Sequence, residues 1–203
     1  MAAAVLRAEA TAASCDRRLH VIGVTWSDDA AAEAALLVES LTADGLDNVV
    51  PVRLVEAAET LARGLVSVIG YDKTVVCVLE RESATAVMVD SCDGETRTAV
   101  KHVPGGADGL IRWLATMFDR SSWQPEGVVV VGGDADLIAI SLQLDDALPV
   151  PVFTQSGAEL ALARGAALAS AQGGGFTDAQ VDDSVANPRA ERQSLARCRT
   201  PAH

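Results

Sequence analysis

Two adjacent glycines follow a short apolar run, at a place where a ligand-binding turn could form. The run is Val128–Val131, and Gly132 and Gly133 come directly after it, followed by Asp134 and Asp136. Glycine has no Cβ, so the backbone can approach a flat ligand closely, and amide groups at a helix N-terminus point outward. The glycine pair is interpreted either as such a site or as a plain turn. The two aspartates either favour the next helix through its dipole or bind a cation.

Other polar residues are candidates for chemistry at strand ends and turns. Glu80, Glu82 and Asp90 could act as paired acids in general acid–base catalysis, although carboxylates on a hairpin turn are usually solvated, which is the interpretation adopted. Thr25 and Trp26 end the first expected strand, and the carboxyl ends of strands in open α/β sheets face the ligand crevice. Thr25 is therefore a candidate binding residue, whereas Trp26 could equally be packing.

The cysteines and histidines show no metal-ligand or catalytic spacing. The four cysteines lie far apart, and the pattern indicates buried hydrophobes or surface thiols. His20 and His102 stand at expected strand ends without a Ser, Cys or Asp partner that would complete a nucleophilic site. We therefore expect no metal site and no catalytic residue.

Hydrophobic periodicity predicts alternating strands and helices that would position these residues. Strands are expected at 20–26, 49–54, 74–79, 84–90, 96–102, 128–131 and 150–153. Helices are expected at 1–13, 30–42, 56–69, 110–118, 137–147 and 158–171. Ser27 should cap the helix at 30–42, with Leu36, Leu37 and Leu41 on its apolar side. Short turns between the three strands of 74–102 predict an antiparallel meander.

This order predicts an N-terminal helical extension at 1–19, one α/β domain at 20–171 and a disordered tail at 172–203. The tail contains a Gly173–Gly175 run, many polar residues and few large apolar ones. A net charge of −12 and the lack of a basic face argue against nucleic-acid binding. No apolar run is long enough to span a bilayer and no secretory signal is evident, so a cytoplasmic location is expected.

Three segments resemble the closing part of the Hsp70 nucleotide-binding domain, the adenosine-binding end of Hsp70- and actin-like ATPases. They are Val128–Ile138, Ala147–Val152 and Glu159–Ala169, the last with Arg-Gly-Ala-Ala. The resemblance implies a ribonuclease H-like/actin-like ATPase lobe, with a mixed sheet, a three-stranded antiparallel meander and helices packed on it. It also implies a crevice for ATP or ADP. The residues that would form this crevice are Gly132, Gly133, Asp134, Asp136, Arg164 and Thr25.

The sequence departs from the family pattern where the phosphates would bind. The turn at 79–84 has no glycine, although glycines there would let backbone N–H groups wrap the phosphates. Glu80 and Glu82 would repel a triphosphate unless Mg²⁺ lay between. The family's adenine-stacking Arg falls near Asp136, and no match to the family's first lobe is expected in this sequence. The resemblance therefore implies a degenerate, non-hydrolysing module, a pseudo-ATPase.

Two alternatives to this module remain open. One is an active ATPase completed by another lobe or subunit, and the other is a structural or regulatory α/β protein without a ligand. If the chain is a single lobe, its cleft face is uncovered, and this face is expected to bind a protein partner or a second copy. The expected contacts are Trp26, Trp113 or Trp123. The high Ala, Val, Gly, Asp and Arg usage with little Lys indicates a high-GC bacterial source, such as an actinobacterium.

Overall fold

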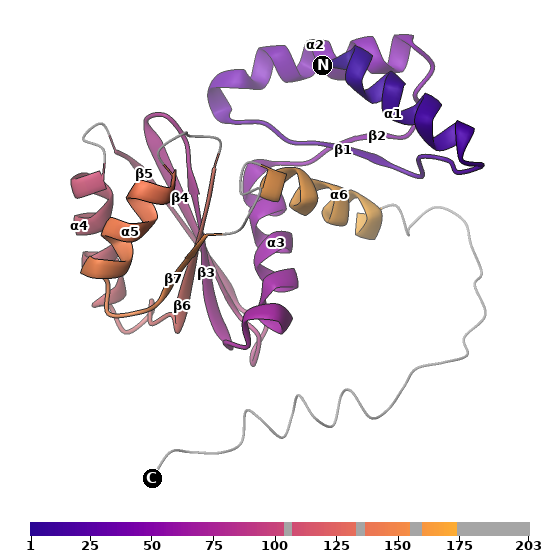
Figure 1. Ribbon diagram of the computed structural model, residues 1–203. Helices are drawn as coiled ribbons and strands as arrows, with labels where there is room; N and C mark the ends of the chain where they lie inside the picture. Colours follow the sequence, from indigo (N-terminus) through magenta and orange to yellow (C-terminus); the bar gives the residue numbers. More distant parts are fainter. Residues whose placement is uncertain (104–106, 133–136, 155–159, 174–203) are drawn as a thin grey trace, which may run out of the picture.

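The computed structural model describes residues 1–103, 107–132, 137–154 and 160–173, and its centre is a five-stranded mixed sheet (Figure 1). The strand order is β5-β4-β3-β6-β7. β3 pairs antiparallel with β4 and β4 with β5, which confirms the expected meander, and β6 runs parallel to both β3 and β7. The strands are β3 (Lys73–Leu79), β4 (Ser83–Asp90), β5 (Thr96–His102), β6 (Gly127–Gly132) and β7 (Val152–Thr154).

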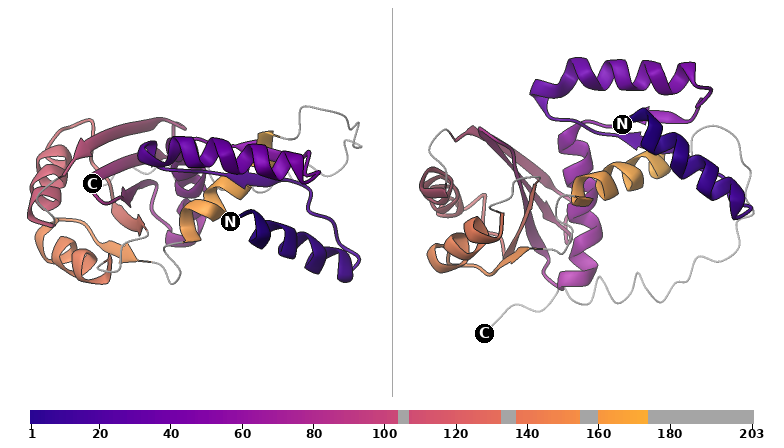
Figure 2. Two further views of the ribbon diagram at one scale, coloured as in Figure 1. Left: turned by 90° about the horizontal axis from the view of Figure 1, so that it is seen from above. Right: turned by 45° about the horizontal axis from the view of Figure 1, so that its top comes forward.

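Helices cover both faces of this sheet, which explains why its central strands are apolar without alternation. One face carries α4 (Ala107–Phe118) and α5 (Leu137–Ala147), and the other carries α3 (Leu54–Ile69), as Figures 1 and 2 show. Alternate valines of β6 face opposite sides. Val128 and Val130 pack with the α4 and α5 residues, whereas Val129 and Val131 pack with those of α3. The β-branched run thus joins two hydrophobic layers.

A separate two-stranded parallel sheet precedes the five-stranded one. It consists of β1 (Ile22–Val24) and β2 (Val49–Pro51), joined by η1 (Asp28–Ala30) and α2 (Ala31–Ala43). α1 (Ala2–Ser14) lies beside this unit (Figure 1). The expected strands at 20–26 and 49–54 were both longer than the observed β1 and β2. The second cannot extend to residue 54, because α3 already begins at Leu54. Pro51 ends its strand, and the next amide, of Val52, donates to the carbonyl of Val24 over 2.8 Å.

α2 differs from its expected form at both its start and its face. The hydroxyl of Ser27 donates to the Asp29 carboxylate and caps no helical N–H, because the 3₁₀ turn η1 intervenes before α2. Leu41 is fully buried, but Leu36 is 65% exposed, so its assignment to the apolar side was wrong. A helix lying on only two strands buries a narrow row of side chains, here Ala34 and Leu41.

α6 (Ala161–Gly173) connects the two sheets through close backbone contacts. A Cβ added at Gly165 would lie 2.1 Å from the carbonyl oxygen of Ala57 in α3. A Cβ at Gly23 of β1 would lie 2.5 Å from the carbonyl oxygen of Ala166. The small residues of this helix therefore serve close packing against α3 and β1.

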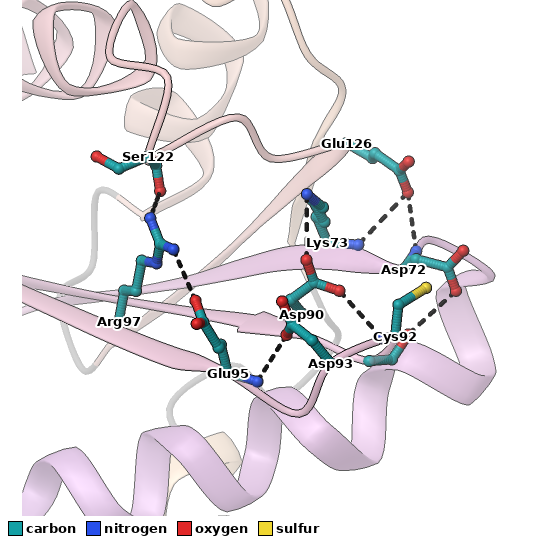
Figure 3. A network of polar contacts seen from close by, with 10 residues as sticks. Asp72, Lys73, Asp90, Cys92, Asp93, Glu95, Arg97, Ser122 and Glu126 are labelled. Carbon is teal, nitrogen blue, oxygen red and sulfur yellow. Dashed lines mark hydrogen bonds and ion pairs between the residues drawn. The ribbon is translucent and has the colours of Figure 1, made fainter. Parts of the chain in front are cut away.

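A polar network holds together the end of the sheet where β3 begins (Figure 3). Lys73 pairs with Asp90 across the β3–β4 ladder over 3.1 Å, and the Asp90 carboxylate also accepts the amide of Cys92 over 3.0 Å. Glu126, just before β6, accepts the amide of Asp72 over 2.8 Å. The network joins β3, β4 and the segment before β6, and so supports their register. Among the described residues, no helix is long and apolar enough to cross a membrane.

Candidate functional site

A crevice of about 550 Å³ lies between the β1–β2 unit and the five-stranded sheet. Its walls come from the residues after β1, the start of α3, the β3–β4 turn, the end of β6 and the first turn of α6. The crevice therefore lies at the carboxyl ends of the parallel strands β1, β3 and β6, where open α/β sheets bind ligands. The chain supplies both walls of this crevice, one of them from Thr25, Trp26 and Ser27.

Thr25 contributes a buried hydroxyl that has no partner among the described residues. It directly follows β1 and lines the crevice, as the sequence suggested for the end of this strand. Its Oγ1 atom is shielded from solvent and makes no hydrogen bond in the described structure. A buried polar group that lacks a partner costs about 1–3 kcal/mol, so such atoms in native structures usually have a ligand or an ordered water as a partner.

Glu80, in the β3–β4 turn, also lines the crevice and contributes a second such atom. One carboxylate oxygen, Oε2, accepts the hydroxyl of Ser83 over 2.7 Å, and the Glu80 amide donates to the Ser83 carbonyl over 2.9 Å, which closes the β3–β4 turn. The other oxygen, Oε1, is buried and has no partner in the described part of the chain. The carboxylate is therefore held in place through Oε2, while Oε1 is shielded from solvent without a described donor.

Gly132 lines the crevice from the last position of β6, and it is not a turn residue. It pairs with Leu79 in the parallel ladder, and a Cβ at this position would lie 2.5 Å from the Leu79 carbonyl oxygen. The glycine is needed for the close approach of these strand ends. The hairpin turn thus lies beside Gly132. Gly133, Asp134 and Asp136 lie outside the described residues.

Arg164 is not brought to the crevice. It is exposed on α6, and only its neighbours Leu162 and Ala163 line the cavity. The reason is helical geometry, because Gly165 must face α3 and successive side chains are rotated by about 100°. The lining also includes Asp29 and Arg81, which the sequence did not single out. Their only signal was proximity in sequence to Thr25 and Glu80.

The three carboxylates considered as paired acids do not come together. Glu80 precedes β4 and Asp90 ends it, so the length of that strand, roughly 24 Å at about 3.4 Å per residue, separates them. The expectation that all three are simply solvated was also wrong. Glu82 is exposed, but Glu80 has a buried oxygen, and Asp90 is only 7% exposed and paired with Lys73.

The three tryptophans lie in three different environments. Trp26 lines the crevice, Trp113 lines another groove, and Trp123 is 8% exposed within the core, which argues against Trp123 as a partner contact. Cys77 is a buried hydrophobe, as expected, and burial raises the pKa of its thiol to about 12. No group of three or more His, Cys, Asp or Glu able to hold a metal occurs in the described ranges.

Solved structures share this arrangement at low sequence identity. The chain is similar to inorganic polyphosphate/ATP-glucomannokinase from Arthrobacter sp. strain KM, with 17% identity and a TM-score of 0.55 over 85% of this chain and 82% of that one. It is also similar to the ethanolamine utilization protein EutJ from Carboxydothermus hydrogenoformans, with 13% identity and a TM-score of 0.54 over 82% and 73%. These likenesses and the mixed sheet with its meander show the expected α/β fold of an actin-like ATPase lobe.

A chain of a PilM-PilN type IV pilus biogenesis complex is similar over a shorter part, with 18% identity and a TM-score of 0.46. The match covers 68% of this chain and 58% of that one, so this chain spans less than two thirds of its length. No curated protein gives a significant match. A family model matches residues 1–181, and the chain therefore belongs to the family of unknown function DUF7159.

Proposed function

We propose that this protein is an actin-like module that binds an adenine nucleotide, ATP or ADP, without hydrolysing it, and that it acts through a protein partner. One observation carries the nucleotide half of the proposal. Two buried oxygens, Thr25 Oγ1 and Glu80 Oε1, have no partner among the described residues, and both belong to side chains that line the same crevice. A ligand that supplies hydrogen bonds to both removes two desolvation costs at once.

The dimensions and position of the crevice suit a nucleotide-sized ligand. Its volume of about 550 Å³ lies within the range of about 300–1,000 Å³ typical of small-molecule and cofactor sites. A carboxylate oxygen only accepts hydrogen bonds, whereas a hydroxyl both donates and accepts. Glu80 therefore favours a donor such as a ribose hydroxyl or an amino group. The resemblance of 128–169 to the adenosine end of Hsp70-like domains points to the same ligand class.

The β3–β4 turn supports binding without hydrolysis. It consists of Glu80, Arg81 and Glu82 and contains no glycine, so its backbone does not offer the flexible N–H loop that wraps phosphates. Glu80 lines the crevice, and the charge of its carboxylate disfavours a triphosphate nearby unless a cation lies between them. Arg81 is the one cationic side chain among the lining residues of the described chain. These charges favour a nucleotide with fewer phosphates.

The partner half of the proposal rests on the exposed rim of the crevice. Trp26 is only partly buried there, and a large aromatic side chain at a surface is a common anchor of protein interfaces. The occupant of the rim is a partner protein or a second copy of this chain, acting in the cytoplasm. Light scattering at high micromolar concentration distinguishes the two, because a strictly monomeric protein would exclude the second copy.

The test is calorimetric titration with ATP, ADP and adenosine, with and without Mg²⁺, together with thermal melting. Binding must raise the melting temperature by mass action. Glu80→Gln should weaken binding about 10-fold or more, because the amide nitrogen replaces an acceptor by a donor. Glu82→Gln is the matched control on the same turn, since Glu82 is exposed and does not line the crevice.

The outcomes of these measurements distinguish a non-hydrolysing nucleotide-binding module from a ligand-free protein and from an ATPase. If no nucleotide shifts the melting temperature or gives heat, the nucleotide site is refuted and a ligand-free regulatory protein is favoured. Mg²⁺-dependent phosphate release that Glu80→Gln abolishes would instead refute the non-hydrolysing assignment. It would favour an ATPase, completed by another lobe or subunit if the purified chain alone is slow.

A further inference from the structure

A second groove, of about 760 Å³, lies between the end of β5 and α4, and it shares no residue with the crevice. Three of its described lining side chains are cationic and a fourth is a histidine, and none of the described ones is acidic. These side chains are Lys101, His102, Arg112 and Arg120. The groove therefore concentrates positive charge in a chain whose net charge is −12.

Among the described residues the cations of this groove have no partner, unlike three other cations on α3, β3 and β5. Arg63, Lys73 and Arg97 each form an ion pair with a neighbouring carboxylate. In the described part of the chain, the side chains of Lys101, His102, Arg112 and Arg120 take part in no ion pair or hydrogen bond. With 28 acidic residues against 16 Lys and Arg, a pairing partner would be available on most surfaces of this protein. Since no described side chain pairs with these groups, they can bind an external anion.

The groove also has an apolar floor. Trp113 and Val103 line it, and both are partly buried against the core residues beneath α4. The helix approaches the end of β5 closely, since a Cβ at Gly109 would lie 3.1 Å from the Val103 side chain. An indole face flanked by guanidinium groups suits a ligand that carries both an apolar side chain and negative charges.

We propose that this groove binds an acidic peptide segment of a partner protein, with a leucine-like side chain on Trp113 and Asp or Glu carboxylates on Arg112, Arg120 and Lys101. The planar guanidinium groups can hold carboxylates through two parallel hydrogen bonds each. Nucleic acid fits less well, because a chain of net charge −12 repels a long polyanion outside this one groove. The apolar floor would also remain unused by a phosphate backbone.

The experiment measures fluorescence anisotropy of labelled peptides with the full chain. The probe is a ten-residue peptide in which Asp and Glu flank a Leu-Leu pair, and its comparators are an all-Glu peptide, a Lys-Leu peptide and a single-stranded oligothymidylate. The acidic Leu-containing peptide should bind most tightly, and about 0.5 M salt should weaken it because the contacts are partly electrostatic. The all-Glu peptide should bind more weakly, because it cannot use Trp113.

Two double variants with the same charge change complete the test. Arg112→Glu with Arg120→Glu should weaken binding at least about 10-fold, the equivalent of one charge-assisted hydrogen bond. Arg7→Glu with Arg18→Glu reverses two exposed cations elsewhere and should change affinity less than about 3-fold. Equal losses in both variants, a lack of acidic-peptide binding, or tighter binding of the oligothymidylate would each overturn the proposal.

Discussion

Replacing Thr25 by valine tests the central feature of the crevice, a hydroxyl that is buried without a hydrogen bond. Valine has nearly the shape of threonine but lacks the oxygen, so the substitution removes Oγ1 and leaves the packing largely unchanged. Oγ1 has no partner in the described structure. The ligand-free protein should therefore become more stable, which is the opposite of the usual effect of a substitution at a partly buried position.

The size of the effect follows from the desolvation of the hydroxyl. A buried polar group without a partner costs about 1–3 kcal/mol, and this cost disappears in Thr25→Val. For a chain of this size, each kcal/mol changes the melting temperature by about 2–4 °C. The ligand-free variant should melt about 2–12 °C above the wild-type protein. Its affinity for the nucleotide should fall, since one ligand contact is lost.

Scanning calorimetry and urea unfolding of the ligand-free proteins measure this change directly. Thr98→Val is the control, because Thr98 is exposed on β5, and its effect should stay within about 0.5 kcal/mol. A lower melting temperature for Thr25→Val would mean that Oγ1 is hydrogen-bonded in the free protein. The argument that this atom awaits a ligand would then fail, even if a nucleotide binds.

Three further predictions concern the scaffold. Gly165→Ala should destabilise the fold by about 2 kcal/mol or more in urea unfolding, since its Cβ would lie 2.1 Å from a carbonyl oxygen of α3. Gly64→Ala, which meets no atom closer than 4.0 Å, should instead stabilise by about 0.5–1 kcal/mol; equal effects would contradict the packing argument. The hydrogen bond from Arg63 lowers the pKa of Glu59 below its ordinary 4.5, so this contribution to stability is present above that pH and is lost as the pH falls through the lowered pKa. Glu59→Gln should therefore flatten the loss of stability below about pH 4.5, and an unchanged acid profile would count against the pair. Burial raises the pKa of Cys77 to about 12, so its alkylation at pH 8 should follow global unfolding, and rapid labelling of the native protein would contradict its burial.

Local sequence patterns predicted most of the elements that form the sheet. The expected β5 and α5 have the observed bounds, and the meander and the buried strand β6 were found because β-branched runs and turns are short-range signals. The errors are at places where long-range packing competes with these patterns. Leu36 follows a helical apolar spacing, yet it is exposed because too few strands lie beneath α2 to cover it.

The features of the crevice also divide into those set by local sequence and those set by long-range packing. The sequence by itself determined the absence of glycine in the β3–β4 turn and placed Thr25 at a strand end, because both follow from residue type and local order. Only the tertiary structure decided that Thr25 Oγ1 and Glu80 Oε1 are buried in residues that line one crevice, that Gly132 serves strand contact, and that Arg164 is exposed outside that crevice. The physical reason is that loss of water from a polar atom depends on segments far apart in the chain, which α3 and α6 bring together through contacts as close as that of Gly165.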